Sequence, residues 1–167
     1  EDAMAGLVEE TLTSACKGLA AMRETEGAGM EQDLRGRIAA LRTLLQSVEA
    51  RVAEMPSQAA VQIRERLRKL LEGALPNEER LLQEIALLAD RSDVSEELAR
   101  VQTHLQHLER LLNEGGAIGR KLDFLLQELN REVNTLSVKS SDSQVSEVII
   151  QVKGEIEKIR EQTQNIE

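Results

Sequence analysis

The sequence has almost no aromatic residues. Across 167 residues it holds one Phe, at position 124, and neither Trp nor Tyr, and it has only two prolines. Leu, Ala, Glu, Arg and Gln are abundant, and all of them are strong helix formers. A core of Leu, Ile, Val and Ala without large rings suits long, thin helical packing better than a cavity around a ligand. We therefore expect an all-α protein.

Cysteine and long apolar runs are also scarce. The single cysteine, Cys16, excludes an internal disulfide, and its setting among Ala and Leu predicts a small buried or interfacial hydrophobe in a reducing compartment. No apolar run reaches the length of a membrane span, and no signal peptide opens the sequence. We expect a cytoplasmic protein without a membrane partner.

Several catalytic motifs are missing as well. We find no convincing Ser/His/Asp catalytic triad and no Cys/His spacing typical of a zinc site. The glycines at 115, 116 and 119 are too sparse for a phosphate-binding loop, and a helix-to-helix turn explains them. The net charge of −9 argues against the basic surface typical of a nucleic-acid binder. The basic cluster at positions 64–69 is interpreted as a solvated helix face.

The first half of the sequence predicts a helical arm over residues 1–83. Apolar residues recur every three or four positions over residues 2–54 and past Gly27 and Gly29, which favours one helix of about 80 Å over a bend at the glycines. Pro56 is expected to end this helix, and Ser57 to cap the next one. A break at 73–76 and a cap at Asn77 would begin a third helix, giving a long antiparallel, coiled-coil-like hairpin.

The second half, residues 84–167, predicts a compact helical bundle. Asp93 and Glu96 have the spacing of a capping box, and a helix follows to Leu112. Residues 113–116 should stop it, and further helices are expected over about 117–138 and 143–164. These three helices should pack as antiparallel neighbours. The residues expected to face the core of the first and last of them are Val94, Leu98, Val101, Leu105, Leu108, Leu112, Val145, Val148, Ile149, Val152, Ile156 and Ile159.

The middle helix of this bundle carries an unusual polar side. Its apolar stripe is Ile118, Leu122, Leu125, Leu129, Val133 and Leu136. Its other side gathers carboxylates, amides and a guanidinium within about two turns, and Glu128 and Glu132 share a face because they stand four residues apart. Such a face is either simply solvated or able to hold a hard divalent cation against a phosphate. Residue spacing leaves both interpretations open.

A set of ordered motifs resembles the C-terminal region of the YicC/YloC family of bacterial proteins. The motifs are Glu84-Ile-Ala, Arg91-Ser-Asp93, Glu96-Glu97-Leu98, Arg100, His104, Gly119-Arg-Lys-Leu-Asp-Phe124, Gln127-Glu-Leu-Asn-Arg-Glu132, Asn134-Thr135, Lys139 and the closing stretch 156–167. The resemblance covers about residues 84–167. It implies a metal-dependent endoribonuclease that assembles as an oligomer. The family also has an N-terminal domain that we do not find here, so this chain is expected to be a C-terminal fragment.

The resemblance implies roles for particular residues. A divalent cation, Mn²⁺ or Mg²⁺, would be held by Glu97, Asp123, Glu128 and Glu132, and His104, Glu128 and Glu97 would be catalytic. Contacts to RNA would come from Arg100, Arg120, Lys121, Arg131 and Lys139. A neutral imidazole at His104 could bind a transition metal or move a proton, although a lone histidine is also common as a structural residue.

Two alternatives to the nuclease stay open. The chain could be a scaffold that oligomerises the full protein while a missing N-terminal domain does the chemistry, or it could be a metal-independent RNA-binding clamp. The expected partners are single-stranded RNA and further copies of the chain, with a hexamer as one option, and no DNA. Cleavage assays with Mn²⁺, Mg²⁺ or a chelator would separate these hypotheses.

Overall fold

The computed structural model describes residues 2–70, 78–140, 142–164 and 166, and over these residues it contains helices and no strand. The five helices are α1 (Asp2–Leu70), α2 (Glu78–Arg91), α3 (Ser95–Glu114), α4 (Gly119–Lys139) and α5 (Ser143–Thr163). The all-α prediction is confirmed. None of the described helices is both long and apolar enough to cross a membrane.

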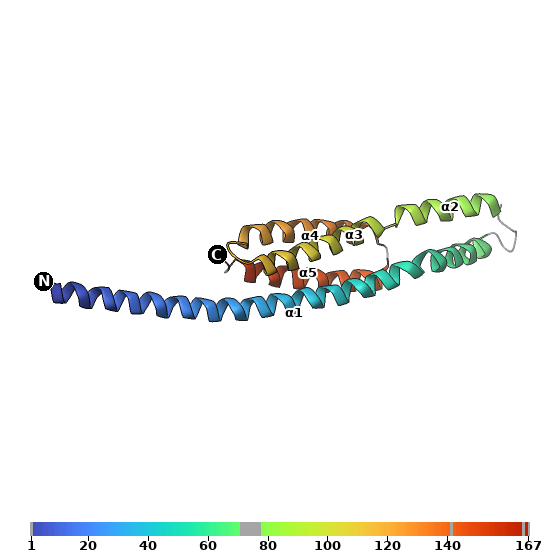
Figure 1. The fold of residues 1–167 in the computed structure, drawn as a ribbon. Coiled ribbons are helices and arrows are strands. Elements are labelled where there is room, and N and C mark those ends of the chain that lie inside the picture. The colour runs from blue at the N-terminus through green and yellow to red at the C-terminus, as the bar shows by residue number, and fades with distance from the viewer. Residues whose placement is uncertain (1, 71–77, 141, 165, 167) are drawn as a thin grey trace.

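Helix α1 runs the whole length of the molecule (Figure 1). Its 69 residues correspond to about 100 Å at 1.5 Å per residue. The predicted continuity past Gly27 and Gly29 is confirmed, but the predicted end at Pro56 and the new helix capped by Ser57 are wrong. An interior proline removes one hydrogen bond and costs about 3 kcal/mol. Packing on both sides of position 56 opposes that cost, because α1 contacts the bundle before it and α2 after it.

The arm therefore has two helices rather than the three expected. Helix α2 turns back along the C-terminal end of α1, with Leu81 buried, and forms the predicted antiparallel hairpin (Figure 1). The basic residues Arg64, Arg66, Arg68 and Lys69 are exposed, as a solvated helix face requires. The expected break at 73–76 and the cap at Asn77 lie outside the described residues.

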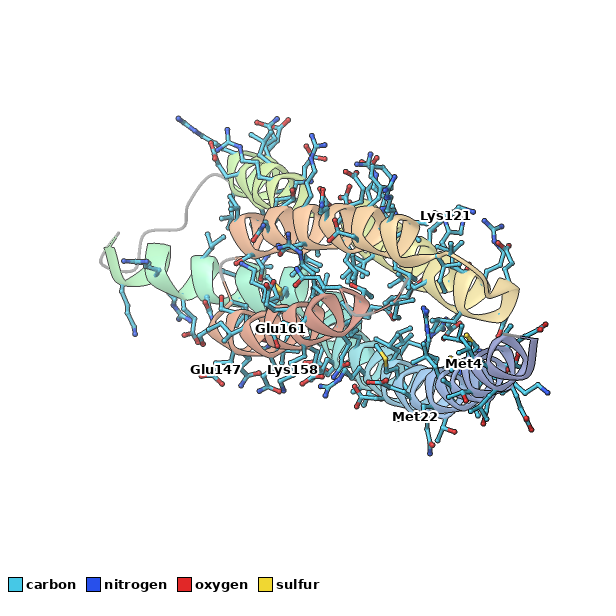
Figure 2. All side chains as sticks on the ribbon, turned by 90° about the vertical axis from the view of Figure 1, so that its left-hand side faces the viewer. Met4, Met22, Lys121, Glu147, Lys158 and Glu161 are labelled. Carbon is cyan, nitrogen blue, oxygen red and sulfur yellow. The ribbon has the colours of Figure 1, made fainter. Side chains whose placement is uncertain are left out.

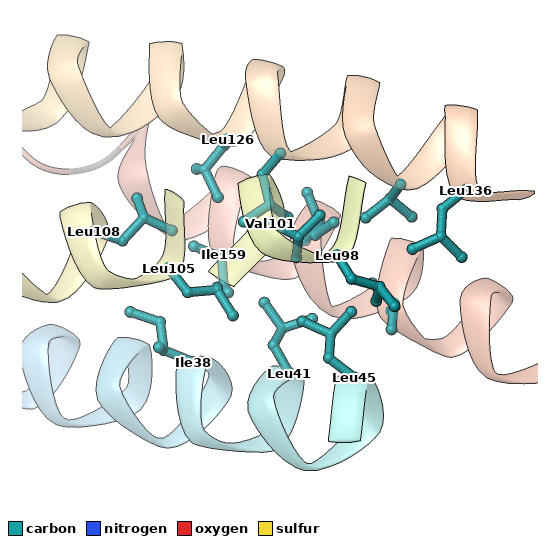
Figure 3. Close-up of a cluster of buried hydrophobic side chains, with 14 of the residues drawn as sticks. Ile38, Leu41, Leu45, Leu98, Val101, Leu105, Leu108, Leu126, Leu136 and Ile159 are labelled. Atoms are coloured by element: carbon teal, nitrogen blue, oxygen red, sulfur yellow. The ribbon is translucent and has the colours of Figure 1, made fainter. Parts of the chain in front are cut away.

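The bundle has four helices, because the middle of α1 packs against α3 and α5 while α4 closes the other side (Figure 1). A prediction limited to the last three helices was therefore incomplete. Neighbours around the bundle run antiparallel, and their aliphatic side chains meet in one core (Figure 3). α1 contributes Leu34, Ile38, Leu41, Leu45 and Val48 to that core.

The predicted inward positions of α3 and α5 are confirmed, with Val148 half-buried and the others buried. On α4 the structure corrects one detail of the stripe. Leu126, which was not predicted, is buried, whereas the predicted Leu125 is half-buried at the edge of the core. The core face of α4 is thus rotated slightly from the one that spacing alone selected.

Arginines fasten α1 to the bundle. Each of four arginines spaced along its middle reaches a polar side chain on another element, namely Arg35 to Asn113 at 2.7 Å, Arg37 to Glu155 at 3.2 Å, Arg42 to Glu109 at 2.8 Å and Arg51 to Asp142 at 2.7 Å. The hydrogen bond from Arg51 and the backbone N–H of Val145 hold the pKa of Asp142 below its usual value. Asp142 also caps α5, accepting from the N–H groups of Gln144 and Val145.

The predicted capping box at the start of α3 does not form. Val94, not Asp93, is the N-cap residue, and it makes no side-chain capping bond. The Asp93 carboxylate instead accepts from the N–H of Ser95 at 2.9 Å, and Glu96 pairs with Arg100 rather than reaching back. Because Asp93 bonds two residues ahead, it forms an Asx-type turn just before the helix.

The N-terminal part of α1 extends beyond the bundle. Every residue from Met4 to Gly29 is exposed, including the predicted stripe members Leu12, Leu19 and Met22. Cys16 is exposed too, so a buried position within the chain was wrong and only the interfacial alternative remains a prediction. The division into domains 1–83 and 84–167 also stays a prediction.

Candidate functional site: a charged seam between α3 and α4

The geometry of the site begins with the turn between α3 and α4. Gly115 and Gly116 have φ angles of 66° and 77°, a left-handed conformation that glycine adopts without strain. This turn sends α4 back along α3. Two contacts fix the register: Arg100 reaches Glu132 at 3.3 Å, and the Nζ of Lys139 donates to the backbone oxygen of Asp93 at 3.2 Å. The predicted polar side of α4 therefore meets Glu97 and Arg100 of α3.

Glu97 and Lys139 form the most buried ion pair of this seam. Their oxygen and nitrogen atoms lie 2.7 Å apart, and the Glu97 side chain is only 9% exposed. Burial by itself would raise the pKa of Glu97, but the hydrogen bond and charge of Lys139, helped by Arg100, outweigh it and hold the pKa below its usual value. The same hydrogen bond raises the pKa of Lys139. Both side chains are therefore charged at neutral pH.

Arg100 bridges the two helices one turn further along. It binds Glu132 across the seam and Glu96 on its own helix. The Glu132 side chain is 11% exposed, whereas that of Arg100 is 54% exposed, so one end of the pair is buried and the other reaches water. A buried carboxylate is tolerated when it is paired in this way. Glu132 was predicted on the polar side of α4, and the structure places it inside the seam.

Three buried polar atoms on these elements lack a hydrogen-bond partner among the described residues. They are Oε2 of Glu97, Nδ1 of His104 and Oγ of Ser140. Buried polar atoms are normally paired, and the exceptions in folded proteins often mark functional positions. Ser140 was not predicted. A serine directly after a helix gives no periodic signal, so only its burial in the fold distinguishes it from an ordinary turn residue.

The other predicted residues fall outside this network. Asp123 lies nine residues before Glu132, about 13.5 Å along the helix axis, and accepts from Arg160 and Gln127. Glu128 is half-buried one turn before Glu132, and the register of Arg100 and Glu132 brings it level with His104. Arg120, Lys121 and Arg131 are exposed on the outer side of α4.

The four predicted metal ligands do not gather into one cation site. Within the part of the chain that the structure describes, no group of three or more His, Cys, Asp or Glu side chains is placed to hold a metal ion. Glu97 and Glu132 are close to the same seam, but each already faces a cationic side chain. The seam alone therefore does not fit a divalent cation.

The opposite end of α4 explains another motif. Gly119 opens this helix, and a Cβ atom there would collide with the backbone oxygen of Ile166. Ile166 packs its side chain against the core and its N–H bonds to Thr163. The glycine of the Gly119-Arg-Lys motif is thus required where the C-terminal segment crosses the start of α4.

Comparison with known proteins identifies the family. The family model described as endoribonuclease YicC-like, C-terminal, matches residues 48–167. The chain belongs to this family. The matched region begins at residue 48, inside α1, after most of the α1 residues that enter the core. It includes the rest of α1 and the whole of α2 to α5. The resemblance inferred from residues 84–167 is confirmed.

Two curated relatives support the YicC-like assignment. The chain is 36% identical over its full length to a probable endoribonuclease YicC from Clostridioides difficile strain 630, and covers 57% of that protein. It is 42% identical over 88% of its length to a probable endoribonuclease YicC from Haemophilus influenzae, and covers 50% of it. The chain thus spans about half the length of these YicC relatives.

Proposed function

We propose that this chain is the C-terminal helical section of an enzyme that cleaves single-stranded RNA. Membership of the YicC-like family and the names of both relatives support this proposal. The structural observation that carries it is the seam: two buried carboxylates, two cations and a histidine lie along it, and Glu97, His104 and the adjacent Ser140 each have a buried polar atom without a partner among the described residues.

The side chains of the seam suit phosphodiester chemistry. The guanidinium of Arg100 reaches water and can bind two phosphate oxygens at once. Lys139 is a further cation beside it, and it holds Glu97 in its charged form. His104 and Glu128 lie at one level along the bundle and are the candidates for moving a proton. Glu97 and Glu132 would keep Arg100 and Lys139 in position before RNA binds.

Dependence on Mn²⁺ or Mg²⁺ is a second part of the proposal. It is supported by the family resemblance and by the carboxylates of α3 and α4, which offer the oxygen ligands that such cations prefer. Because the described residues do not form a complete ligand set, a cation would take some of its ligands from elsewhere in the full-length protein or from RNA.

The direct test compares full-length protein with this chain alone, each incubated with single-stranded RNA and Mn²⁺, Mg²⁺ or a chelator. We expect cleavage by the full-length protein only when a divalent cation is present. Glu128→Gln and Glu132→Gln should reduce the cleavage rate at least 100-fold with RNA binding retained, whereas Arg131→Ala should mainly weaken binding. Wild-type cleavage rates in both Gln variants would place the reaction outside α3 and α4.

The second candidate function is an oligomerisation scaffold. The exposed apolar residues of α1 favour it, because Met4, Leu7, Leu12, Leu19 and Met22 are each more than half exposed. We propose that these residues pack against further copies in a homo-oligomer, for which a hexamer is one option. Scaffold and nuclease are compatible roles. The scaffold stands alone only if the seam variants leave cleavage unchanged.

A further inference from the structure

The fully exposed side chains on the outer face of α4 are cationic, neutral polar or apolar, although the chain as a whole is acidic. The exposed residues of α4 are Arg120, Lys121, Phe124, Gln127, Arg131, Asn134, Thr135 and Val138. Glu128 also lies on this side, four residues after Phe124, but it is half-buried, while Asp123 pairs with Arg160 and Glu132 is buried in the seam. The chain as a whole carries 30 acidic against 21 basic residues, so this composition is unusual within it.

Helix α5 offers the contrast. Its exposed charged residues are Glu147, Glu157, Lys158 and Glu161, which is an acidic surface. Figure 2 places Lys121 of α4 on a different side of the molecule from Glu147 and Glu161 of α5. The bundle therefore has a cationic side and an acidic side, even though its net charge is strongly negative.

Phe124 lies at the centre of the cationic side. It is the only aromatic residue of the chain, yet it is 60% exposed while the core is built entirely from aliphatic side chains. Helical spacing places Arg120 and Lys121 one turn before it, and Arg131 two turns after it, on the same face. None of these three cations has an ion pair within the described residues. The nearby Asp123 is held aside by Arg160.

The chemistry of this face selects its partner. Three unpaired cations around one exposed ring complement a polyanion that also carries flat, stackable groups. An apolar protein partner would need more apolar contact, but the only other large hydrophobe exposed on this face is Val138, almost four turns away. Aromatic stacking requires an unpaired base, which single-stranded RNA provides and a duplex does not.

We propose that the outer face of α4 binds single-stranded RNA, with Phe124 stacked on a base and Arg120, Lys121 and Arg131 contacting phosphates. This inference rests on the proposed function, and it adds a base-stacking residue to the RNA contacts. The distance from Arg120 to Arg131 is about 17 Å along the helix, which matches about five nucleotides of stacked strand. Stacking is tolerant of sequence, because every base has a flat face.

The test uses full-length protein and a fluorescent ten-nucleotide RNA, with binding measured by anisotropy. Phe124→Leu keeps an apolar side chain but removes the ring, and it should weaken binding about 5- to 100-fold, the range expected for one lost stack. Phe124→Tyr should bind like the wild type. Ile150→Ala, on the acidic α5 face and 70% exposed in the wild type, is the matched control and should leave binding unchanged.

Two further arms connect the effect to bases and phosphates. An oligonucleotide with abasic sites should bind the wild type as weakly as normal RNA binds Phe124→Leu, and the variant should not distinguish the two. Arg131→Ala should lower the slope of log affinity against log salt by about one.

The possible failures are distinguishable. If the wild type neither binds nor cleaves RNA, the proposed function and this inference both fail. If the wild type cleaves RNA but Phe124→Leu binds it normally, only the stacking role is overturned. If Phe124→Leu binds RNA normally and instead disrupts assembly, the face contacts protein, which also overturns the inference.

Discussion

At the scale of single residues, the seam shows how a buried acid is kept charged. Burial raises the pKa of Glu97, whereas Lys139, a backbone hydrogen bond and the charge of Arg100 together lower it by a larger amount. The strongest lowering influence is the hydrogen bond from Lys139, whose nitrogen lies 2.7 Å from the carboxylate oxygen. Removing Lys139 should therefore reverse the direction of the shift rather than merely reduce it.

This reversal gives a pH prediction. In the wild type, the pKa of Glu97 lies below its ordinary value of 4.5. The ionised carboxylate therefore stabilises the fold above pH 4.5, and this stabilisation is lost as the pH falls through the folded-state pKa. In Lys139→Met, burial should raise the pKa of Glu97 above its ordinary value. Protonation of Glu97 as the pH falls toward 4.5 should then stabilise the fold. Lys139→Met should also lower the Tm at pH 7 by about 3 °C or more, because a buried charge is left unpaired.

Chemical denaturation of Lys139→Met between pH 4.5 and 7 measures the effect. The double variant with Glu97→Gln is the control, because it lacks the titrating group and should lose the added pH dependence. Identical pH profiles for the single variant and the wild type would mean that Lys139 does not set the charge of Glu97.

At the scale of helices, the start of α4 depends on a close crossing by the C-terminal segment. Gly119→Ala places a methyl group against the backbone oxygen of Ile166. A backbone atom cannot move aside as the end of a flexible side chain can. We expect a loss of about 1–3 kcal/mol in the free energy of unfolding, as for overpacking in general. Gly154→Ala on α5 meets open space and should instead stabilise by about 0.5–1 kcal/mol. Urea unfolding of both variants measures the difference, and equal effects would contradict the crossing.

The sequence predicted most of the helices because apolar spacing recurs over long segments. Leu98, Val101 and Leu105 of α3, and Ile149, Val152 and Ile156 of α5, are buried as their spacing requires. The error at Pro56 has a tertiary cause, since contacts with the bundle and with α2 preserve a helix that local propensity would end. The predicted cap at Asp93 was wrong because the helix begins one residue later, with Val94 as its N-cap.

The candidate site could be predicted only in part. Helical spacing placed Glu97 and Arg100 on one stripe and Glu128 and Glu132 on another, but the pairing of Arg100 with Glu132 depends on the register set by the glycine turn. That register also separates Asp123 from the seam. Neither the burial of Ser140 nor the exposure of Phe124 follows from spacing, because both depend on which sides of the helices the neighbouring elements cover.

At the scale of the whole molecule, the N-terminal part of α1 has no covering element among the described residues. An apolar stripe of this kind favours association in water at about 25 cal/mol per Å² of apolar area buried. We expect this chain to self-associate at micromolar concentration. Multi-angle light scattering should detect the oligomer, and Leu12→Glu with Leu19→Glu should dissociate it while circular dichroism stays helical. A strictly monomeric wild type at high micromolar concentration would contradict this prediction.

The continuity of α1 also has a mechanical consequence. Its middle is held to the bundle by four arginine contacts, and about 48 Å of the same helix extends beyond the first buried residue, Leu34. A rigid rod of that length turns a tilt of about 10° at these contacts into a displacement of about 8 Å at its tip. α1 can therefore act as a lever, converting a small adjustment of helix packing in the bundle into a larger movement of its exposed N-terminal end.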